Sequence, residues 1–221
     1  MGKIKHFCKN LITKLMLKNE FVALLKKYFI EKATIYVANI VEKYNIQLVF
    51  TKPRKTRKGT FIIVKNQSPK ITLNRDMKPE EMLFVFLHET AHLLVFKKYG
   101  KRKKPHGLEW QKIFLMLVKE NIKNGNFSEK TREILLKCFF TPTLHYHPNC
   151  KLLHTHFRPL RNKNNLYLYQ LSVNDKFIID NDIKKQFILK KKRKTQYLCK
   201  NLVNEKLYLV HSFIEIKKIY E

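Results

Sequence analysis

The stretch FLHETAHLLVFKKYGKRKKPHGLEW, residues 86–110, holds side chains that can bind a metal ion and activate a water molecule. His88 and His92 are four residues apart, about one turn of an α-helix, so a helix places both imidazoles on one face. Two imidazoles on one face suit a tetrahedral zinc ion. Glu89 lies about 100° around the helix from His88 and can reach a zinc-bound water without ligating the metal. The pattern therefore predicts a hydrolytic zinc site, with His88 and His92 as ligands and Glu89 as the general base.

Signals for the beginning and end of a helix flank this motif. Pro79 suits the first helical position, and the glutamates that follow it favour a helix N-terminus. Gly100 is a typical stop at the other end, so the sequence predicts a helix from Pro79 to Tyr99. The other faces of this helix carry apolar side chains, namely Leu83, Phe84, Leu87, Leu94 and Val95. The alternative, a structural helix that carries two histidines by chance, is the weaker interpretation because of these signals.

His106 is the candidate for a third ligand. A lone histidine after the basic run KRKK is usually just exposed. Here, however, Trp110 follows, and the apolar pattern beyond it predicts a second helix with a face that can seat it. A reversal of the chain after Gly100 can bring His106, at the start of that second helix, back to the first pair. We therefore expect His88, His92 and His106 to hold one Zn²⁺ and to leave its fourth position to water.

These residues resemble those of the SprT-like metallopeptidases, which are relatives of the DNA–protein-crosslink protease Spartan. The segments that carry the resemblance are Tyr28–Tyr44, Thr51-Lys52-x-Arg54-x-Thr56-x-x-Gly59, Ile71-Thr72-Leu73-Asn74, His88-Glu89-x-x-His92 and Pro105-His106-Gly107-x-Glu109-Trp110. Together they span roughly Leu25 to Leu117. The chain is most similar to the bacterial members that end in a small β-rich region. The resemblance strengthens the prediction that His106 is the third ligand.

The resemblance implies an α+β fold whose catalytic domain is zincin-like, with the helix of the His-Glu-x-x-His motif packed on a small antiparallel sheet. A small β-rich C-terminal module follows. The substrate class that it suggests is proteins bound to or crosslinked with DNA, with DNA gating the activity. Some SprT proteins end in a cysteine zinc ribbon, but Cys8, Cys138, Cys150 and Cys199 form no C-x-x-C pair. Without that ribbon, basic segments would have to recognise DNA, or the protein does not recognise it at all.

The charge of the chain also favours DNA as a partner, but it is a less specific signal than the resemblance. The net charge is +29, because 46 lysines and arginines oppose 17 aspartates and glutamates. A balance this basic favours an anionic partner, with nucleic acid ahead of a membrane surface. The excess of lysine over arginine, with much Asn, Ile, Phe and Tyr, is also typical of an AT-rich genome, which alone would raise the charge. DNA thus stays an open partner, whereas a protein or peptide substrate follows from the zinc motif.

The chain divides into four segments by its apolar pattern. Residues 1–20 form a basic N-terminal extension, for which a membrane-surface helix is the weaker alternative. Residues 21–140 hold the catalytic domain, residues 141–165 are a polar linker, and residues 166–221 alternate like the strands of a small SH3-like or barrel module. Lysines interrupt every apolar run before about 18 residues, and no signal peptide is evident. The sequence therefore predicts a cytoplasmic protein with no transmembrane segment.

Three polar runs within these segments have two interpretations each. The run PRKTRKG, residues 53–59, is predicted to be the tip of a hairpin between the strand-like runs 47–50 and 61–64. The run Lys190–Lys194 is predicted to be a second basic tip. Either one is a solvated turn or a loop that contacts phosphates. The run HYHPNCKLLHTH, residues 145–156, could hold a second metal, but its spacing matches no zinc module and favours a linker.

Taken together, these features predict a zinc-dependent metallopeptidase that hydrolyses peptide bonds by a Glu-activated zinc-bound water. Zinc peptidases of this class usually hold the substrate as an extra strand along a sheet edge, for which Ile62–Lys65 and Lys70–Leu73 are the candidates. The main alternative is a non-catalytic nucleic-acid-binding protein whose zinc is structural, which requires a fourth protein ligand such as Cys138 or one of the histidines of residues 145–156. A third possibility is a housekeeping peptidase with no nucleic-acid role.

Overall fold

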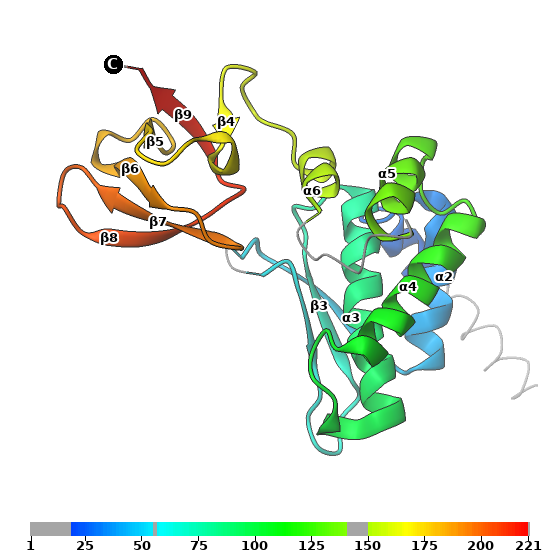
Figure 1. Ribbon diagram of the computed structural model, residues 1–221. Coiled ribbons are helices and arrows are strands. Elements are labelled where there is room, and N and C mark those ends of the chain that lie inside the picture. The colour runs from blue at the N-terminus through cyan, green and yellow to red at the C-terminus, as the bar shows by residue number, and fades with distance from the viewer. Residues whose placement is uncertain (1–18, 55–56, 141–149, 221) are drawn as a thin grey trace, which may run out of the picture. The chain divides into compact units, whose positions relative to one another are not determined.

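The computed structural model describes residues 19–54, 57–140 and 150–220 of the chain (Figure 1). The chain divides into two compact units, Met1–Tyr146 and His147–Glu221. The first unit combines helices with a three-stranded sheet and the second consists mainly of strands, so the protein is α+β with a β-rich C-terminal part, as predicted. Most of the basic N-terminal extension lies outside the described residues. Of the helices that the structure describes, none combines the length and the apolarity needed to cross a bilayer.

Helices make up most of the first unit. Residues 19–25 are helical and are separated by a turn from the next helix, so the apolar stretch before Tyr44 forms two helices. The remaining helices are α2 (Glu31–Lys43), α3 (Pro79–Tyr99), α4 (Leu108–Lys123) and α5 (Glu129–Phe139). The bounds of α3 are those predicted from its punctuation, with Pro79 in the first turn and Gly100 as a C-cap at φ 66°.

Helix α3 is the buried centre of this unit, and α4 lies alongside it (Figure 1). Phe86 of α3 meets Phe29 edge to face, with ring centroids 5.9 Å apart. On another face of the helix, Phe84 meets Phe114 of α4 in the same geometry at 5.3 Å. Edge-to-face aromatic pairs add to the free energy of apolar burial and fix the relative rotation of the packed elements. The helix that carries the histidine motif is therefore held in a defined orientation.

The N-terminal end of α3 is also tied to α5. One carboxylate oxygen of Glu80 accepts a hydrogen bond from the backbone N–H of Ser128 at 2.5 Å, and the other accepts from Thr131 Oγ1 at 2.6 Å. Ser128 is the N-cap of α5, where free N–H groups favour a negative charge. These two hydrogen bonds thus give the N–H group at the start of α5 an acceptor and anchor the start of α3.

The sheet of the first unit is mixed, which corrects the expectation of a small antiparallel sheet. Its strands are β1 (Gln47–Thr51), β2 (Gly59–Ile62) and β3 (Lys70–Asn74), and their order is β1-β3-β2. β2 pairs antiparallel with β3, but β1 pairs parallel with β3. Because β3 lies between the first two strands, the predicted hairpin between β1 and β2 is wrong. The basic run that joins them crosses from one edge of the sheet to the other.

Side chains of this crossing connection are bonded to the sheet and to α3. Arg54 Nε donates to Asn74 Oδ1 at 2.9 Å, and Asn74 Nδ2 donates to the Arg54 carbonyl at 3.1 Å. Lys58 forms an ion pair with the buried carboxylate of Glu81 on α3. Arg54 and Lys58 therefore stabilise the fold. Lys52, just before the run, and Arg57 within it are exposed.

The second unit begins with helix α6 (Lys151–Phe157), which lies within the segment predicted to be a linker. Its strands form one sheet of order β4-β9-β5-β6-β7-β8, in which every described pairing is antiparallel. The strands are β4 (Leu166–Tyr167), β5 (Lys176–Ile178), β6 (Gln186–Lys191), β7 (Gln196–Asn201), β8 (Leu207–His211) and β9 (Glu215–Ile219). The basic run Lys190–Lys194 lies at the junction of β6 and β7, where a hairpin was predicted.

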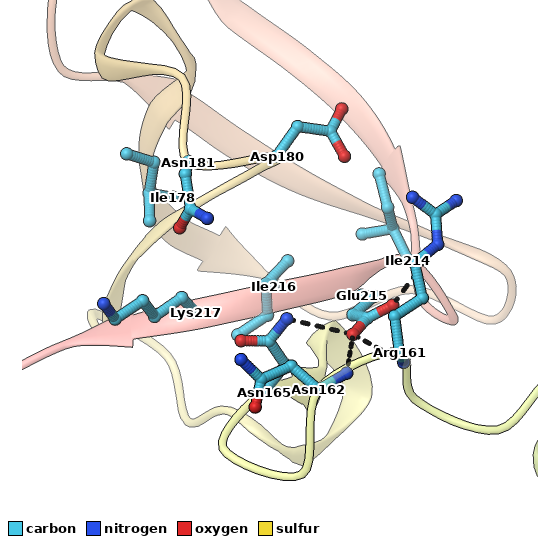
Figure 2. A pocket seen from close by; sticks show the side chains of 10 residues that line it. All are labelled: Arg161, Asn162, Asn165, Ile178, Asp180, Asn181, Ile214, Glu215, Ile216 and Lys217. Atoms are coloured by element: carbon cyan, nitrogen blue, oxygen red, sulfur yellow. Dashed lines mark hydrogen bonds and ion pairs between the residues drawn. The ribbon is translucent and has the colours of Figure 1, made fainter.

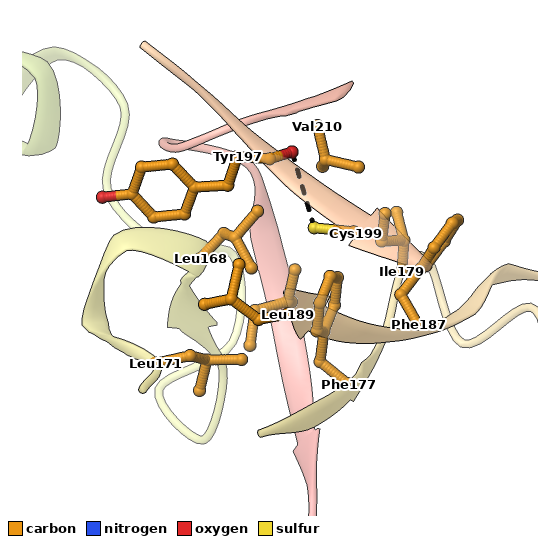
Figure 3. Packing of buried hydrophobic residues seen from close by; sticks show 10 residues of the cluster. Leu168, Leu171, Phe177, Ile179, Phe187, Leu189, Tyr197, Cys199 and Val210 are labelled. Atoms are coloured by element: carbon orange, nitrogen blue, oxygen red, sulfur yellow. Dashed lines mark hydrogen bonds between the residues drawn. The ribbon is translucent and has the colours of Figure 1, made fainter. Parts of the chain in front are cut away.

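The core of the second unit is apolar and gathers on one side of this sheet (Figure 3). Phe177 and Leu189 are fully buried there, and Phe177 stacks on Phe187 with ring centroids 5.6 Å apart. The other members of the cluster are Leu168, Leu171, Ile179, Tyr197, Cys199, Val210 and Ile216. Along β6 and β7 buried and more exposed residues alternate, as expected of strands with one face on a core.

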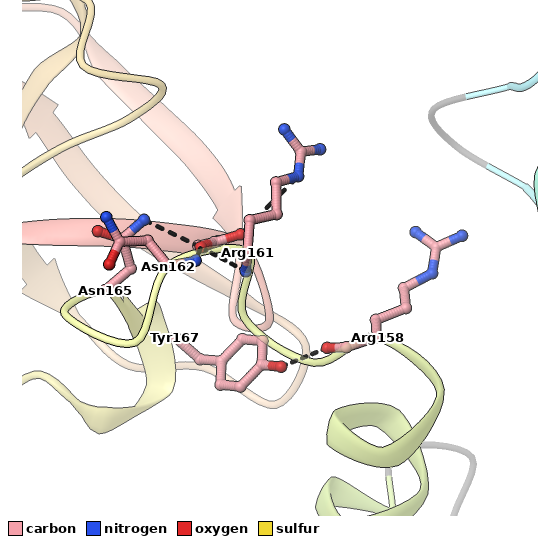
Figure 4. Close-up of polar contacts among 6 residues, drawn as sticks. Arg158, Arg161, Asn162, Asn165 and Tyr167 are labelled. Carbon is pink, nitrogen blue, oxygen red and sulfur yellow. Dashed lines mark hydrogen bonds and ion pairs between the residues drawn. The ribbon is translucent and has the colours of Figure 1, made fainter.

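A polar brace closes the end of this unit where β4 meets β9 (Figure 4). One carboxylate oxygen of Glu215 accepts hydrogen bonds from the backbone N–H of Arg161 at 2.9 Å and from Asn165 Nδ2 at 2.9 Å. The hydroxyl of Tyr167 donates to the carbonyl of Arg158. These bonds hold the loop that leads from α6 into β4 against the sheet.

Candidate metal centre

Three imidazole nitrogens converge at one point in the first unit. The Nε2 atom of His92 lies 3.3 Å from Nε2 of His88 and 3.1 Å from Nε2 of His106, and the remaining pair is also 3.1 Å apart. Two nitrogens bound at about 2.0–2.1 Å to a tetrahedral zinc would be about 3.3 Å apart. The structure thus brings the three histidines singled out in the sequence to the spacing of zinc ligands.

The donor set fits a zinc ion. When three neutral imidazoles point at one another, their lone pairs or their N–H groups repel. A cation between the three nitrogens removes this repulsion. Imidazole nitrogen is a preferred ligand of zinc. Within residues 19–54, 57–140 and 150–220, no fourth histidine, cysteine, aspartate or glutamate joins the group. Three protein ligands leave one tetrahedral position for water or substrate, which is the pattern of catalytic rather than structural sites.

The first two histidines come from α3 and the third from a tight turn before α4. In this turn the Gly107 N–H donates to the Lys104 carbonyl at 3.0 Å, with Pro105 at the second position and His106 at the third. His106 has φ 61°, a left-handed conformation that is uncommon for residues other than glycine. Such a backbone persists only where the surroundings enforce it. The turn is therefore built to present this one side chain.

Two side-chain contacts hold the turn. Gln111 of α4 donates from Nε2 to the His106 carbonyl at 3.0 Å. Lys103, just before the turn, pairs with Glu109, just after it, at 2.6 Å. The ion pair is partly exposed and contributes little on its own. The bond to the carbonyl acts directly on the strained residue, so Gln111 is the stronger constraint on His106.

Replacing Gln111 with methionine is expected to weaken zinc binding about fivefold, since a hydrogen bond of about 1 kcal/mol that holds the ligand is lost. Methionine keeps the length of the side chain but cannot donate. The measurement is competition for zinc against a chelator of known affinity. Lys112→Met on the exposed side of α4 is the matched control and should bind like the wild type. Equal zinc affinities of Gln111→Met and Lys112→Met would show that Gln111 does not support zinc binding.

Trp110 forms the floor of the centre. Its ring centroid lies 4.6 Å from that of His88, 5.2 Å from that of His92 and 4.7 Å from that of His106. The indole is 1% exposed and stacks on Phe114, with ring centroids 4.8 Å apart. One aromatic side chain thus orients all three imidazoles and shields one side of the centre from water. The sequence indicated only that this residue would seat the second helix.

Partial loss of solvent keeps the histidines in the form that binds metals: His88 and His92 are half-buried, and His106 is exposed. Loss of solvation lowers the pKa of His88 to about 3 and that of His92 to about 4, and the other imidazoles add to the effect. Burial also lowers the pKa of His106. These imidazoles are therefore neutral near pH 7, and a nitrogen lone pair needs no deprotonation before it ligates a metal.

Glu89 follows His88 on α3 but does not join the group of possible ligands. Its side chain is buried, and burial raises the pKa of its carboxyl to about 7. Two features oppose that rise, namely a hydrogen bond from the backbone N–H of Phe61 on β2 and the charge of Arg54. A buried carboxylate next to a metal centre has the placement of a proton acceptor.

Other residues noted in the sequence lie elsewhere. Of the histidine-rich run, His145 and His147 fall outside the described residues. The ring of His154 stacks on Phe213 in the second unit, with centroids 4.1 Å apart. His156 lies against Phe157.

The second unit has a polar groove of about 410 Å³ that is lined by the end of β5 and the residues after it, by β9 and by the loop before β4 (Figure 2). Glu215 lines it, but its carboxylate already accepts the hydrogen bonds of the brace described above. Arg161 lies 3.9 Å from the same carboxylate, and its side chain is otherwise exposed. The acidic and basic groups of the groove thus offset one another, and they present no uniform field to a ligand.

Comparison with known proteins gives one match. The model of the SprT-like family matches residues 19–132, just over half of the chain. The matched range includes the three histidines, Glu89 and the sheet, and it ends within α5. No curated protein and no solved structure matched the chain.

Proposed function

The chain belongs to the SprT-like family, and from its centre we propose that it is a zinc-dependent metallopeptidase. In this proposal His88, His92 and His106 hold the zinc and Glu89 is the general base. The observation that carries the proposal is the convergence of three Nε2 atoms within 3.3 Å of one another, with a buried glutamate next to His88 on the same helix. The zincin-like character of the domain is part of the same proposal.

The chemistry divides between the metal and the protein. A bound zinc would lower the pKa of water from about 15.7 toward about 7 and would polarise the scissile carbonyl. Glu89 takes a proton from the attacking water and passes it to the leaving amine. Burial raises the pKa of the Glu89 carboxyl, and the charge of a bound zinc would oppose that rise. Trp110 keeps one side of the centre dry.

The free edge of β2 is the proposed seat of the substrate. Of the two candidate edges, the one at Lys70–Leu73 belongs to β3, which is flanked by β1 and β2 and has no free edge. β2 is the terminal strand in the described sheet of the first unit and lies beside Glu89. Just beyond its end, Val64 is exposed, as is Ile62 within it. An extended peptide added along β2 would place its backbone next to the base.

DNA-associated proteins are the proposed substrates, with DNA as a partner. Support comes from the net charge of +29 and from the exposed basic side chains at the β6–β7 junction. A backbone-tracking loop of lysines binds phosphates without reading sequence. The alternative of a structural zinc gains no specific support, because within the described residues Cys138 does not join the three histidines.

The test is cleavage of fluorescently labelled casein by zinc-loaded protein, with and without single-stranded DNA. We expect cleavage that a chelator abolishes and that DNA accelerates at low salt but not at high salt. Absence of cleavage by protein that contains equimolar zinc would contradict the peptidase proposal. Cleavage that DNA leaves unchanged at every salt concentration, with no DNA binding, would contradict the DNA proposal alone and favour a general peptidase.

A further inference from the structure

Strand β2 approaches helix α3 most closely at Gly59, its first residue. A Cβ atom at this position would lie 2.7 Å from Val85 Cγ1, 2.8 Å from Glu89 Oε1 and 2.9 Å from Glu89 Cγ. Distances under 3.0 Å are not tolerated between such atoms, so one of the partners would have to move. The side chains of Val85 and Glu89 together thus fill the volume that any other residue at position 59 would occupy.

The backbone of Gly59 gives no other reason for a glycine. Its φ is outside the left-handed region, unlike those of Gly100 and Gly125, which have φ 66° and 67°. A residue with a side chain could adopt this conformation, and glycine within a strand lowers stability. The glycine is therefore explained by the close approach alone.

The next residue on the same face of β2 also contacts α3. Residues two apart in a strand point the same way, so Gly59 and Phe61 both face the helix. The ring of Phe61 lies 6.1 Å from that of Phe96 on α3, and its backbone N–H donates to the Glu89 carboxylate. β2 therefore gives this carboxylate both a space and a donor, and the two together define where its oxygens lie.

We propose that Gly59 is a positioning residue, which sets the place of the Glu89 carboxylate relative to the three histidines. The inference rests on the proposed function, in which Glu89 is the general base. Gly59 has no side chain and takes no part in the reaction itself. It acts only through the space that it leaves for Glu89.

Replacement by alanine should displace the base and spare the metal. Of the two neighbours, the carboxylate is the end of a flexible side chain and moves more easily than Val85 within its helix. The three atoms nearest to the new methyl group belong to Val85 and Glu89, and none belongs to a histidine. A shift of about 1 Å in a catalytic group costs about 100-fold in rate.

The first experiment compares Gly59→Ala, Glu89→Gln and the double variant, each with its zinc content measured. We expect full zinc occupancy in all three. For Gly59→Ala we expect kcat about 100-fold lower, with KM within about twofold of the wild type. The double variant should be no slower than Glu89→Gln alone, because both changes disable one group. Additive losses, or an unchanged kcat in Gly59→Ala, would overturn the inference.

A second experiment needs no activity and separates this inference from the proposed function. Gly59→Ala should lower the unfolding temperature, and adding Glu89→Ala should restore part of that loss, since it removes two of the three closest contacts of the new methyl group and leaves the one with Val85. Gly125→Ala is the matched control. A Cβ there meets nothing within 4 Å but has φ 67°, so Glu89→Ala should not restore its loss. If Glu89→Ala fails to restore Gly59→Ala, the inference is wrong even if the wild type cleaves peptides. If the wild type cleaves nothing while the restoration occurs, the proposed function fails and the packing relation stands.

Discussion

Replacing Glu89 with glutamine is expected to leave equimolar zinc on the protein and to lower kcat by about 10²–10⁴-fold. An amide has almost the shape of the carboxylate, and its oxygen can still accept the hydrogen bond from the Phe61 N–H. It cannot accept a proton from water at neutral pH. The loss should therefore appear in the chemical step and not in folding or metal content. The measurement is casein cleavage together with zinc content and unfolding temperature.

Glu133→Gln is the control for this substitution, because Glu133 is exposed on α5 and away from the centre. It should cleave casein at the wild-type rate. If Glu89→Gln retains more than about a tenth of the wild-type kcat, general-base catalysis by Glu89 is refuted. If it loses zinc in proportion to activity, Glu89 supports the metal site and not the proton transfer.

The second large effect concerns stability. Zinc at about 100 times its dissociation constant should stabilise the folded state by about 2.7 kcal/mol, which corresponds to about 8 °C in unfolding temperature. His92→Ala should abolish this rise, since His92 Nε2 lies within 3.3 Å of both other nitrogens. Only the difference between zinc and chelator is compared, so any cavity left by the substitution cancels.

His211→Ala is the control here, because His211 is exposed in the second unit and is not in the group of three. It should keep the full zinc-dependent rise, whatever its own unfolding temperature. A rise of equal size in His92→Ala would mean that zinc binds elsewhere. If saturating zinc does not raise the unfolding temperature of the wild type, the prediction of a zinc site is wrong.

The helix of the motif could be predicted from the sequence because its signals are local. Pro79 and Gly100 bracket the helix, and the four-residue spacing of His88 and His92 fixes their common face. The sequence predicted that His106 would reach the other two histidines, but it did not predict the turn that brings it there. The φ of His106 is left-handed and its carbonyl accepts a hydrogen bond from Gln111, and no local pattern in the sequence reveals either feature.

The pairing of the strands could not be predicted in the same way. Two strands that follow one another in the sequence usually form a hairpin, and the basic run between β1 and β2 has the composition of a turn. The actual crossing depends on Arg54 reaching Asn74 and on Lys58 reaching Glu81, each about 20 residues away in sequence. The role of Gly59 likewise depends on a residue of another element. Contacts of this range carry no periodic signal.

The charge of the basic run shows how composition can mislead. Arg54 and Lys58 are bonded within the fold and are poorly placed to contact phosphates. The exposed lysines of the β6–β7 junction are a better candidate, but they lie beyond the residues that match the family. The proposal of DNA binding therefore rests on the second unit more than on the first.

X-ray absorption at the zinc edge tests the hydrolytic centre most directly, because it counts the ligands of the bound ion. We predict three imidazole nitrogens at about 2.0 Å and one oxygen from solvent, with the imidazole signal reduced and the zinc weakly held in His106→Ala. Four protein ligands, or any sulfur in the spectrum, would contradict an open catalytic site and would favour a structural zinc.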